Sequence, residues 1–418
     1  MLVCVYIYSW SEVMEVPQSE PNTMQADLRT YYDCLFPYDQ LVRWLQYDDA
    51  GYFARREFSF TIGDDVYVRY KSFGDQKDLK GEIQRLHPTK IDIGAVYTSK
   101  PRESKSAQAG TFLPLEKELV FDIDMTDYDE VRMCCKGTDV CLKCWKFVSV
   151  AIKILDAALR EDLGFKFIFW VFSGRRGVHC WVCDRRARAL TDEQRAGIVE
   201  YFQVIPRGKE GRLRSKTPVL RDVRDFHPAV WRAKELVERY FTEIVVDQHL
   251  LSSEATLKAF SSRLITDLRT VLEQNVADHP LNDSESRWLC IVEYIAQQDQ
   301  NSPTTKAAKC NLYEIMFQYV YPCLDIEVSR KMNHLLKAPW VVHPKTGKLS
   351  VPIDPSTCET FDPHAVPTVK HVVAELELFG VSSLDEYVQR WEISFLVPLH
   401  EELHRSQATN LSSGNDFV

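Results

Sequence analysis

Two aspartates stand one residue apart at the end of a strongly apolar run, ELVFDID at 118–124. Side chains alternate along a β-strand, so Asp122 and Asp124 would share one face with their Cα atoms roughly 6–7 Å apart. Carboxylates this close repel each other unless a divalent cation lies between them. The pair therefore suits two-metal phosphoryl transfer, in which one ion activates the attacking hydroxyl and the other holds a triphosphate. A solvated acidic turn at the strand end is an equally open interpretation.

An arginine-rich turn lies between two strongly β-prone runs, in SGRRGVH at 173–179. Its glycines permit close approach of a ligand to the backbone, and the planar guanidinium groups of Arg175 and Arg176 match phosphate oxygens. Ser173 and His179 can add hydrogen bonds from the strand ends. For an isolated turn of this kind, a hairpin with two solvated arginines is the more common outcome.

Four cysteines fall within a short segment that ends in a Cys-x2-Cys spacing. They are Cys134, Cys135, Cys141 and Cys144. Four thiolates suit a tetrahedral zinc ion and leave no open coordination position, so we predict a structural zinc site. The alternative is a group of buried thiols. Cys180 and Cys183 share the Cys-x2-Cys spacing, but in a strand they face opposite sides, so we interpret them as packing residues.

Further along the chain, Asp325 is a candidate third carboxylate for the metal site. Lys337 and His343 are candidates for phosphate contacts in the same region. Their spacing alone is weak evidence, because a single lysine or histidine is more often a surface or satisfied residue.

The elements that must position these residues follow from hydrophobic period and turn chemistry. The patterns predict a helix at 27–47 broken at Pro37, and a helix at 145–163 that ends near Gly164. The predicted strands are a hairpin at 55–70 that turns at Gly63-Asp64, and runs at 90–98, 118–124, 165–173, 178–183 and 349–353. The mixture predicts an α+β fold.

The pattern changes near Pro206, after which the chain is polar and favours helix to about residue 320. We therefore expect an α+β core in two pieces with a mainly helical insert between them. The apolar run at residues 1–10 is too short to span a bilayer and lacks the features of a secretory signal. These features favour an intracellular protein with no membrane segment.

Composition supports a folded chain but gives an ambiguous charge signal. The 418 residues are 45% hydrophobic and 27% charged, which excludes wholesale disorder. The net charge of −9 argues against a strongly basic nucleic-acid-binding protein. Locally the balance reverses, because residues 175–224 hold 13 Lys and Arg against 6 Asp and Glu. The overall charge predicts a weak, localised grip on nucleic acid.

Taken in order, these motifs resemble those of eukaryotic DNA primase small (catalytic) subunits. The shared motifs are FDID, SGRRGVHCWV, the four-cysteine segment and LDIEVSRKMNHLLKAPWVVHPKTGKLSVPID, preceded by REFSF and KIDIGAVY. The resemblance covers roughly residues 27–370 and is weakest across the insert. It implies the archaeo-eukaryotic primase fold, with a mixed α/β catalytic core at 27–205 and 321–418, a zinc motif at 134–144, a helical insert at 206–320 and an N-terminal extension at 1–26.

The resemblance also implies roles for individual residues. Asp122, Asp124 and Asp325 would bind two Mg²⁺ or Mn²⁺ ions, and the four cysteines would hold one Zn²⁺. The incoming nucleotide would contact Ser173, Arg175, Arg176, His179, Leu335, Leu336, Lys337 and His343. Glu57, Arg69, Lys90 and Asp92 match residues that line the site.

The activity implied is synthesis of short RNA primers on single-stranded DNA from ribonucleoside triphosphates, with release of pyrophosphate. The implied partners are a large primase subunit with an iron–sulfur cluster and the DNA polymerase alpha complex, which places the protein in the nucleus. Two other functions remain open. One is a primase-polymerase of DNA repair or tolerance, and the other is an inactive, zinc-stabilised scaffold.

Overall fold

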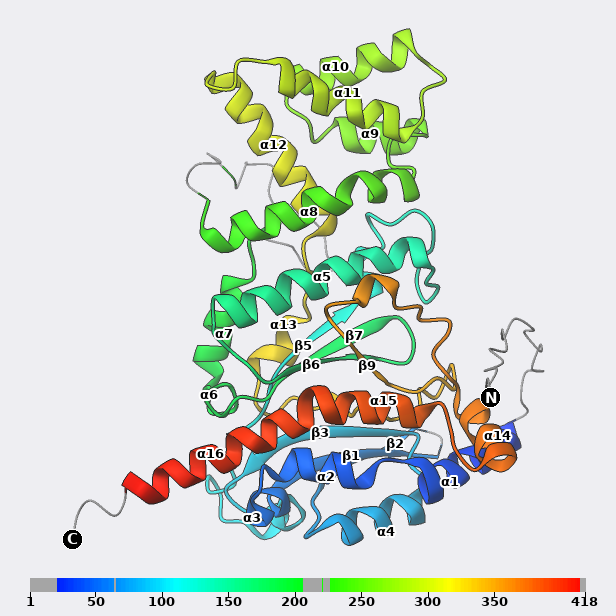
Figure 1. Ribbon diagram of the computed structural model, residues 1–418, viewed down its shortest axis with the longest axis vertical. Coiled ribbons are helices and arrows are strands. Elements are labelled where there is room, and N and C mark those ends of the chain that lie inside the picture. The colour runs from blue at the N-terminus through cyan, green and yellow to red at the C-terminus, as the bar shows by residue number, and fades with distance from the viewer. Residues whose placement is uncertain (1–20, 64, 206–219, 221–225, 414–418) are drawn as a thin grey trace, which may run out of the picture.

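The computed structural model describes residues 21–413 except 64, 206–219 and 221–225. It is a mixed α+β structure with two antiparallel sheets, here sheets A and B, and a stack of helices at one end (Figure 1). The apolar run at residues 1–10 and part of the basic region at 175–224 lie outside the described residues. Among the described helices, none has the length and hydropathy needed to cross a membrane.

Sheet A is built around the hairpin that the sequence predicts. Its strands are β1 (Arg56–Ile62), β2 (Val66–Lys71), β3 (Lys90–Tyr97), β4 (Pro114–Glu116) and β8 (Leu336–Lys337). The order is β2-β1-β3-β4, and β8 also pairs with β3, in the register Asp92 opposite Lys337. The short strand β8 was not predicted, and it brings a segment from far along the chain onto sheet A.

Sheet B contains the predicted acidic strand and both strands that flank the arginine-rich turn. Its strands are β5 (Leu119–Asp124), β6 (Ile168–Phe172), β7 (Gly177–Val182) and β9 (Pro352–Ile353), in the order β5-β7-β6-β9. The strand predicted at 349–353 is therefore limited to β9, and Leu349 forms only an isolated bridge to Val342.

Helices cover both faces of sheet B and contact aromatic side chains of its strands. On one face, the rings of Phe169 and Trp181 pack against Trp44 and Trp391, with ring centroids 5.0–5.4 Å apart in three of these pairs. On the other face, the indole of Trp170 donates to the Asp156 carboxylate across 3.0 Å. Large aromatic side chains thus hold helices against both faces of the sheet.

Helices enclose the two sheets on several sides. The helix predicted at 27–47 begins earlier, at Pro21, and is interrupted by a π-helical turn at Tyr31–Leu35 before the predicted break at Pro37. The α-helices around the two sheets are α1 (Pro21–Thr30), α2 (Tyr38–Gln46), α3 (Ala50–Ala54), α4 (Gln76–Leu86), α5 (Leu142–Glu161), α6 (Arg185–Arg188), α7 (Asp192–Tyr201), α13 (Ile326–Arg330), α14 (Val369–Phe379), α15 (Leu384–Trp391) and α16 (Val397–Ser413).

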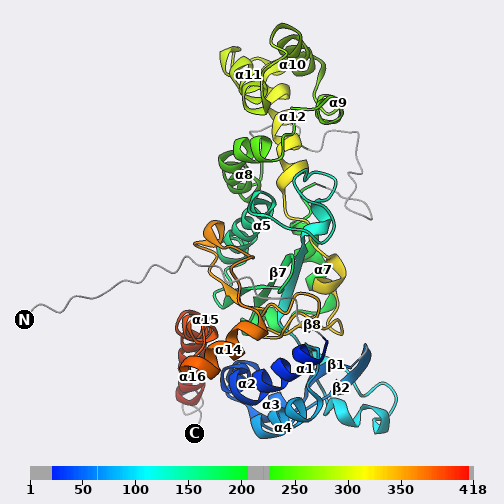
Figure 2. The same ribbon diagram turned by 90° about the vertical axis from the view of Figure 1, so that its right-hand side faces the viewer.

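Five helices form the stack at the far end from sheet A in both ribbon views (Figures 1 and 2). They are α8 (Pro228–Asp247), α9 (Glu254–Ser261), α10 (Thr266–Asp278), α11 (Ser284–Gln297) and α12 (Pro303–Val320). Helix α8 lies along α5, and Lys146 of α5 pairs with Glu243 and Asp247 of α8. The stack therefore rests on the helix that covers sheet B.

Candidate active site

One pocket of about 300 Å³ gathers residues from both sheets and from the late part of the chain. It is lined by Lys90, Asp122, Asp124, Ser173, Arg175, Arg176, His179, Asp325, Val328, His334, Leu335, Leu336, Lys337 and His343. Every residue predicted to bind Mg²⁺ or Mn²⁺ or to contact the nucleotide is in this set. Their roles in chemistry remain predictions, but their convergence in one pocket is a structural finding.

The strand register of sheet B explains how the acidic pair faces the pocket. Asp122 lies opposite His179, and Asp124 lies opposite Gly177, across the β5–β7 ladder. The His179 Nε2 atom is 3.8 Å from an Asp122 oxygen. The third carboxylate, Asp325, lies about 200 residues further along the chain. Its backbone N–H donates to the Asp122 carbonyl at 3.1 Å, which holds it beside the acidic pair. Asp325 then caps helix α13 through Glu327 N–H.

Asp122 and Asp124 have different electrostatic environments. Burial, followed by the neighbouring charges of Asp124 and Asp325, raises the pKa of Asp122 to about 7. For Asp124, burial is outweighed by the hydrogen bonds from Arg176 and Thr126, which lower its pKa. Without a cation the three carboxylates repel one another, and this repulsion adds to the effect of burial on the pKa of Asp122. Oxygen-only ligands of this kind suit Mg²⁺ or Mn²⁺.

Arg176 ties the arginine-rich turn to the acidic strand. Its Nε lies 2.7 and 2.9 Å from the two carboxylate oxygens of Asp124. The guanidinium therefore sits at the edge of the carboxylate cluster, with Arg175 lining the same pocket. A phosphate group entering here would meet positive charge beside the candidate metal ligands.

The two glycines of this turn are required by close contacts. Gly174 has a φ of +87°, and a Cβ there would come within 2.8 Å of the His343 Cβ. A Cβ on Gly177 would lie 2.4 Å from the carbonyl oxygen of Ile123, inside the sheet. The turn can therefore lie this close to His343 and β5 only because both positions lack a side chain.

Lys337 and His343 are held at the opposite wall. The Lys337 Nζ atom donates to the Ser173 carbonyl at 2.7 Å. Burial and the charge of Lys90 lower the pKa of Lys337 to about 7, and burial with Lys337 and Arg175 lowers that of His343 to about 3. Burial similarly lowers the pKa of His179 to about 3. These shifts show that burial and nearby positive charges disfavour the protonated forms of these side chains, and a bound anion would favour them.

Glu57, Arg69, Lys90 and Asp92 match residues that line the site in the resemblance, but only one of them lines this pocket. Lys90 lines the pocket and pairs with Asp92 at 3.1 Å, and Asp92 also accepts from Ser59. Glu57 is fully buried and holds Arg69 at 3.0 Å. Neither Glu57, Arg69 nor Asp92 lines the pocket, so these three support the wall from sheet A.

Two pocket residues were not singled out from the sequence. Val328 and His334 also line the cavity, and burial lowers the pKa of His334. His334 stands in the NHLLK run next to three predicted residues, so its position in the motif was the available signal. No local pattern marks Val328, which lines the pocket because of the orientation of α13.

The four predicted cysteines also converge. One sulfur from each of Cys134, Cys135, Cys141 and Cys144 lies within 4.8 Å of the others, and all four are free thiols. The Cys141 sulfur is 3.5 Å from that of Cys134 and 3.9 Å from that of Cys144. Sulfurs bound to one tetrahedral zinc at ~2.3 Å would be separated by about 3.8 Å. The donor set therefore fits zinc.

Contacts around the cysteines connect the core to the helical stack. Buried Arg132 donates to the carbonyls of Gly137 and Asp139 and pairs with Asp129 at 2.6 Å. The side-chain oxygen of Gln248, at the end of α8, accepts from the backbone N–H of Met133 at 2.7 Å and of Cys134 at 3.2 Å. The sequence reasoning missed both Arg132 and Gln248.

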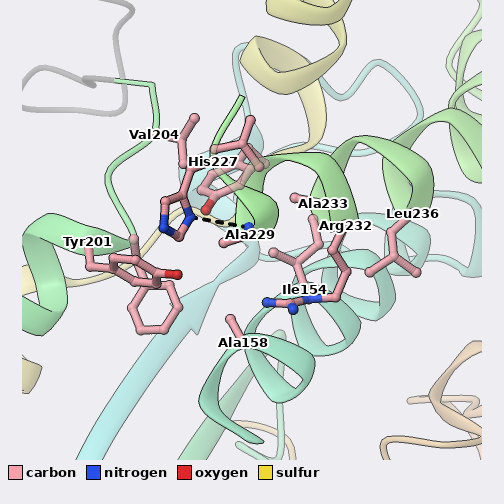
Figure 3. Close-up of a pocket in the computed structure, with 12 residues that line it drawn as sticks. Ile154, Ala158, Tyr201, Val204, His227, Ala229, Arg232, Ala233 and Leu236 are labelled. Carbon is pink, nitrogen blue, oxygen red and sulfur yellow. Dashed lines mark hydrogen bonds between the residues drawn. The ribbon is translucent and has the colours of Figure 1, made fainter. Parts of the chain in front are cut away.

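A second cavity, of about 310 Å³, lies between α5, α7 and α8 (Figure 3). Its wall is largely apolar, and the ring of His227 is engaged with the backbone N–H of Ala229 at 3.3 Å. None of the described residues that line it is a carboxylate or a cysteine. It therefore lacks the groups that metal-dependent phosphoryl chemistry needs.

Three carboxylates opposite arginine, lysine and histidine, in a pocket between two antiparallel sheets, define a site suited to nucleotidyl transfer. A family model described as DNA primase small subunit matches residues 121–355, more than half of the chain. The DNA primase small subunit of Drosophila melanogaster is 42% identical over 87% of this chain and 84% of its own length. Those of Schizosaccharomyces pombe and Saccharomyces cerevisiae are 40% and 38% identical, over 83% and 90% of this chain and 77% and 93% of their own lengths. The chain belongs to the DNA primase small subunit family.

Proposed function

We propose that this chain is the catalytic subunit of a primase that synthesises short RNA primers on single-stranded DNA from ribonucleoside triphosphates, releasing pyrophosphate. Family membership supports a primase role. The observation that carries the chemistry is the single pocket in which Asp122, Asp124 and Asp325 face Arg175 and Arg176.

In this proposal, some pocket residues bind metal ions and others bind the phosphates. Asp122, Asp124 and Asp325 would hold Mg²⁺ or Mn²⁺, and bound ions would activate the attacking 3′-hydroxyl and neutralise the triphosphate. Arg175 and Arg176 would bind the phosphates through planar donors. Lys337 and His343 would complete the phosphate-binding wall, while Leu335 and Leu336 would line the sugar and base side.

The remaining assignments belong to the same proposal. The cysteine cluster would bind one structural Zn²⁺, supported by its sulfur spacing. A large subunit with an iron–sulfur cluster and the DNA polymerase alpha complex would be partners, and the site of action would be the nucleus. The words "small subunit" in the names of the relatives support a larger partner.

A primer-synthesis assay on unprimed poly-dT with ATP and Mg²⁺ or Mn²⁺ tests the activity. The wild-type chain should form short RNA products, and Asp124→Asn should lose them because a neutral amide is a poor ligand for these cations. Circular dichroism should show that the variant remains folded.

Asp299→Asn is the matched control, because Asp299 is exposed and caps only its own turn in the helical stack. It should retain full activity. A folded and active Asp124→Asn protein would disprove the metal assignment. Products made from deoxynucleotides in preference to ribonucleotides would instead indicate a primase-polymerase.

A further inference from the structure

Two histidines on the last helix meet an aspartate from the first part of the chain. His400 and His404 are four residues apart on α16, so both project from the same face. Asp48 lies in the turn between α2 and α3. Figure 2 shows α16 alongside these early helices, and none of the three residues lines the candidate active-site pocket. The sequence reasoning singled out none of these three residues.

The three side chains converge closely enough to share one ion. The His400 Nδ1 atom is 2.9 Å from one Asp48 oxygen, and the His404 Nε2 atom is 3.9 Å from the other. One ligand atom from each residue lies within 4.8 Å of the other two. Among the described residues, the only other group with this property is the four-cysteine cluster.

A simple ion pair leaves part of this cluster unsatisfied. The second oxygen of Asp48 is buried and has no hydrogen-bond partner. Unpaired buried polar atoms are costly, and each one in a folded protein calls for an explanation. A cation between Asp48 and the two rings would engage the free carboxylate oxygen and His404 together.

The donor set selects the kind of cation. Two imidazoles and one carboxylate suit borderline divalent ions such as Zn²⁺, Co²⁺ or Ni²⁺, whereas Mg²⁺ prefers oxygen ligands. Three protein ligands leave a fourth position for water.

Tyr47 and Asp48 both adopt positive φ, at 46° and 60°, which turns the chain sharply at this point.

We propose that Asp48, His400 and His404 form a second transition-metal site, which binds a borderline divalent cation such as Zn²⁺ and clamps α16 to the turn between α2 and α3. The clamp joins the two ends of the described chain. It would add to an ion pair between Arg43 of α2 and Glu392, in the segment that precedes α16. The Arg43 Nη1 and Glu392 Oε1 atoms are 2.5 Å apart.

Metal analysis of the full-length chain tests this site with Zn²⁺ as the probe. Wild-type protein and His404→Ala are equilibrated with excess Zn²⁺, freed of unbound metal and analysed by mass spectrometry. The wild type should retain about one more zinc per chain than the variant, because removing one of three ligands should greatly weaken binding. His404 is largely exposed, so the variant should fold normally. The cysteines and the aspartate trio contribute equally to both proteins.

Two further readouts keep the result specific. Added Zn²⁺ should raise the melting temperature of the wild type more than that of His404→Ala, since binding to the folded state stabilises it. Co²⁺ should give a visible band that lacks thiolate-to-metal charge transfer and is lost in the variant.

His371→Ala is the matched control. The exposed side chain of His371 on α14 pairs with Glu375, one helical turn away, and so offers two ligands rather than three. This variant should keep the wild-type zinc content. Equal zinc content and equal thermal response in the wild type and His404→Ala would overturn the proposal.

Discussion

At the scale of single residues, Arg176 links the metal-ligand candidates to the phosphate-binding candidates. In the free protein its guanidinium is occupied by Asp124, at 2.7 and 2.9 Å. This contact lowers the pKa of Asp124, although burial opposes it, and so keeps one carboxylate charged. Arg176 therefore neutralises part of the charge of the acidic cluster in the free protein.

Replacing Arg176 by alanine should mainly weaken nucleotide binding. Loss of a charge-assisted hydrogen bond worth about 1.5–3 kcal/mol would raise the KM for nucleotide roughly 10- to 100-fold. Steady-state primer synthesis at varied ATP concentration measures this. Arg390→Ala serves as the control, since that exposed arginine contacts Glu386 on its own helix. An unchanged KM in Arg176→Ala would argue against a phosphate role.

At the scale of elements, a buried ion pair connects the two sheets. Arg56 of β1 donates to Glu118, just before β5, at 2.7 and 2.9 Å, and both side chains are fully buried. Tyr47 donates to the same carboxylate at 2.7 Å. Because the candidate active-site pocket is formed by groups from both sheets, this pair helps to set the distance across it.

Arg56→Ala should destabilise the protein by about 3–5 kcal/mol, because it leaves the Glu118 charge buried without its partner. Chemical unfolding followed by tryptophan fluorescence measures the change. The double variant Arg56→Met/Glu118→Leu should recover much of the loss, since it removes both charges. In contrast, Arg85→Ala removes an exposed pair with Glu82 and should change little. A stable Arg56→Ala protein would show that the pair is dispensable.

The cysteine segment is a second connection between elements. The backbone N–H groups of Met133 and Cys134 donate to the side-chain oxygen of Gln248, at the end of α8. If zinc holds the four sulfurs, the metal orders this segment and, through it, the seating of the helical stack on α5.

Metal removal should therefore lower the melting temperature before it affects the chemistry. Purified protein should contain about one tightly held zinc per chain that Cys141→Ser loses. Cys34→Ser should retain it, since Cys34 is exposed and outside the cluster. Differential scanning calorimetry after chelation measures the effect. Metal-free protein with unchanged thermal stability would contradict a structural zinc.

At the scale of the whole molecule, the net charge of −9 limits how strongly the chain can hold nucleic acid. Part of that charge is the carboxylate cluster, which bound cations would neutralise. The positive groups around the pocket are few and local, namely Lys90, Arg175, Arg176 and Lys337. A template would be held weakly by this chain alone.

Fluorescence anisotropy with a labelled single-stranded oligonucleotide tests this expectation. Binding by the isolated chain should be weak and should fall further as salt increases, with a shallow slope that reflects few phosphate contacts. Affinity should rise when a larger partner subunit shares the template. Tight binding by the isolated chain would contradict this expectation. A steep fall with salt would then indicate a large basic surface, and insensitivity to salt would indicate non-ionic contacts.

Much of the site could be predicted because its motifs are local. The alternation in β5 places Asp122 and Asp124 on one face, and the glycines at 174 and 177 mark a turn with close contacts. The π-helical turn at Tyr31–Leu35 and the two-residue strand β8 could not be predicted, because each depends on packing partners elsewhere in the chain. Short strands carry too little periodic signal to distinguish them from loops.

The sequence by itself determined which chemical groups exist and how neighbours along one strand, turn or helix are arranged. Strand alternation, turn glycines and cysteine spacing act over a few residues, so a local pattern contains them. Tertiary structure alone decided that Asp325 lies beside Asp122, that Lys337 reaches Ser173, and that Asp48 meets His400. These contacts join segments more than 150 residues apart. They form only when the two sheets and their covering helices pack, because burial, and not any local preference, offsets the entropy of closing such long loops.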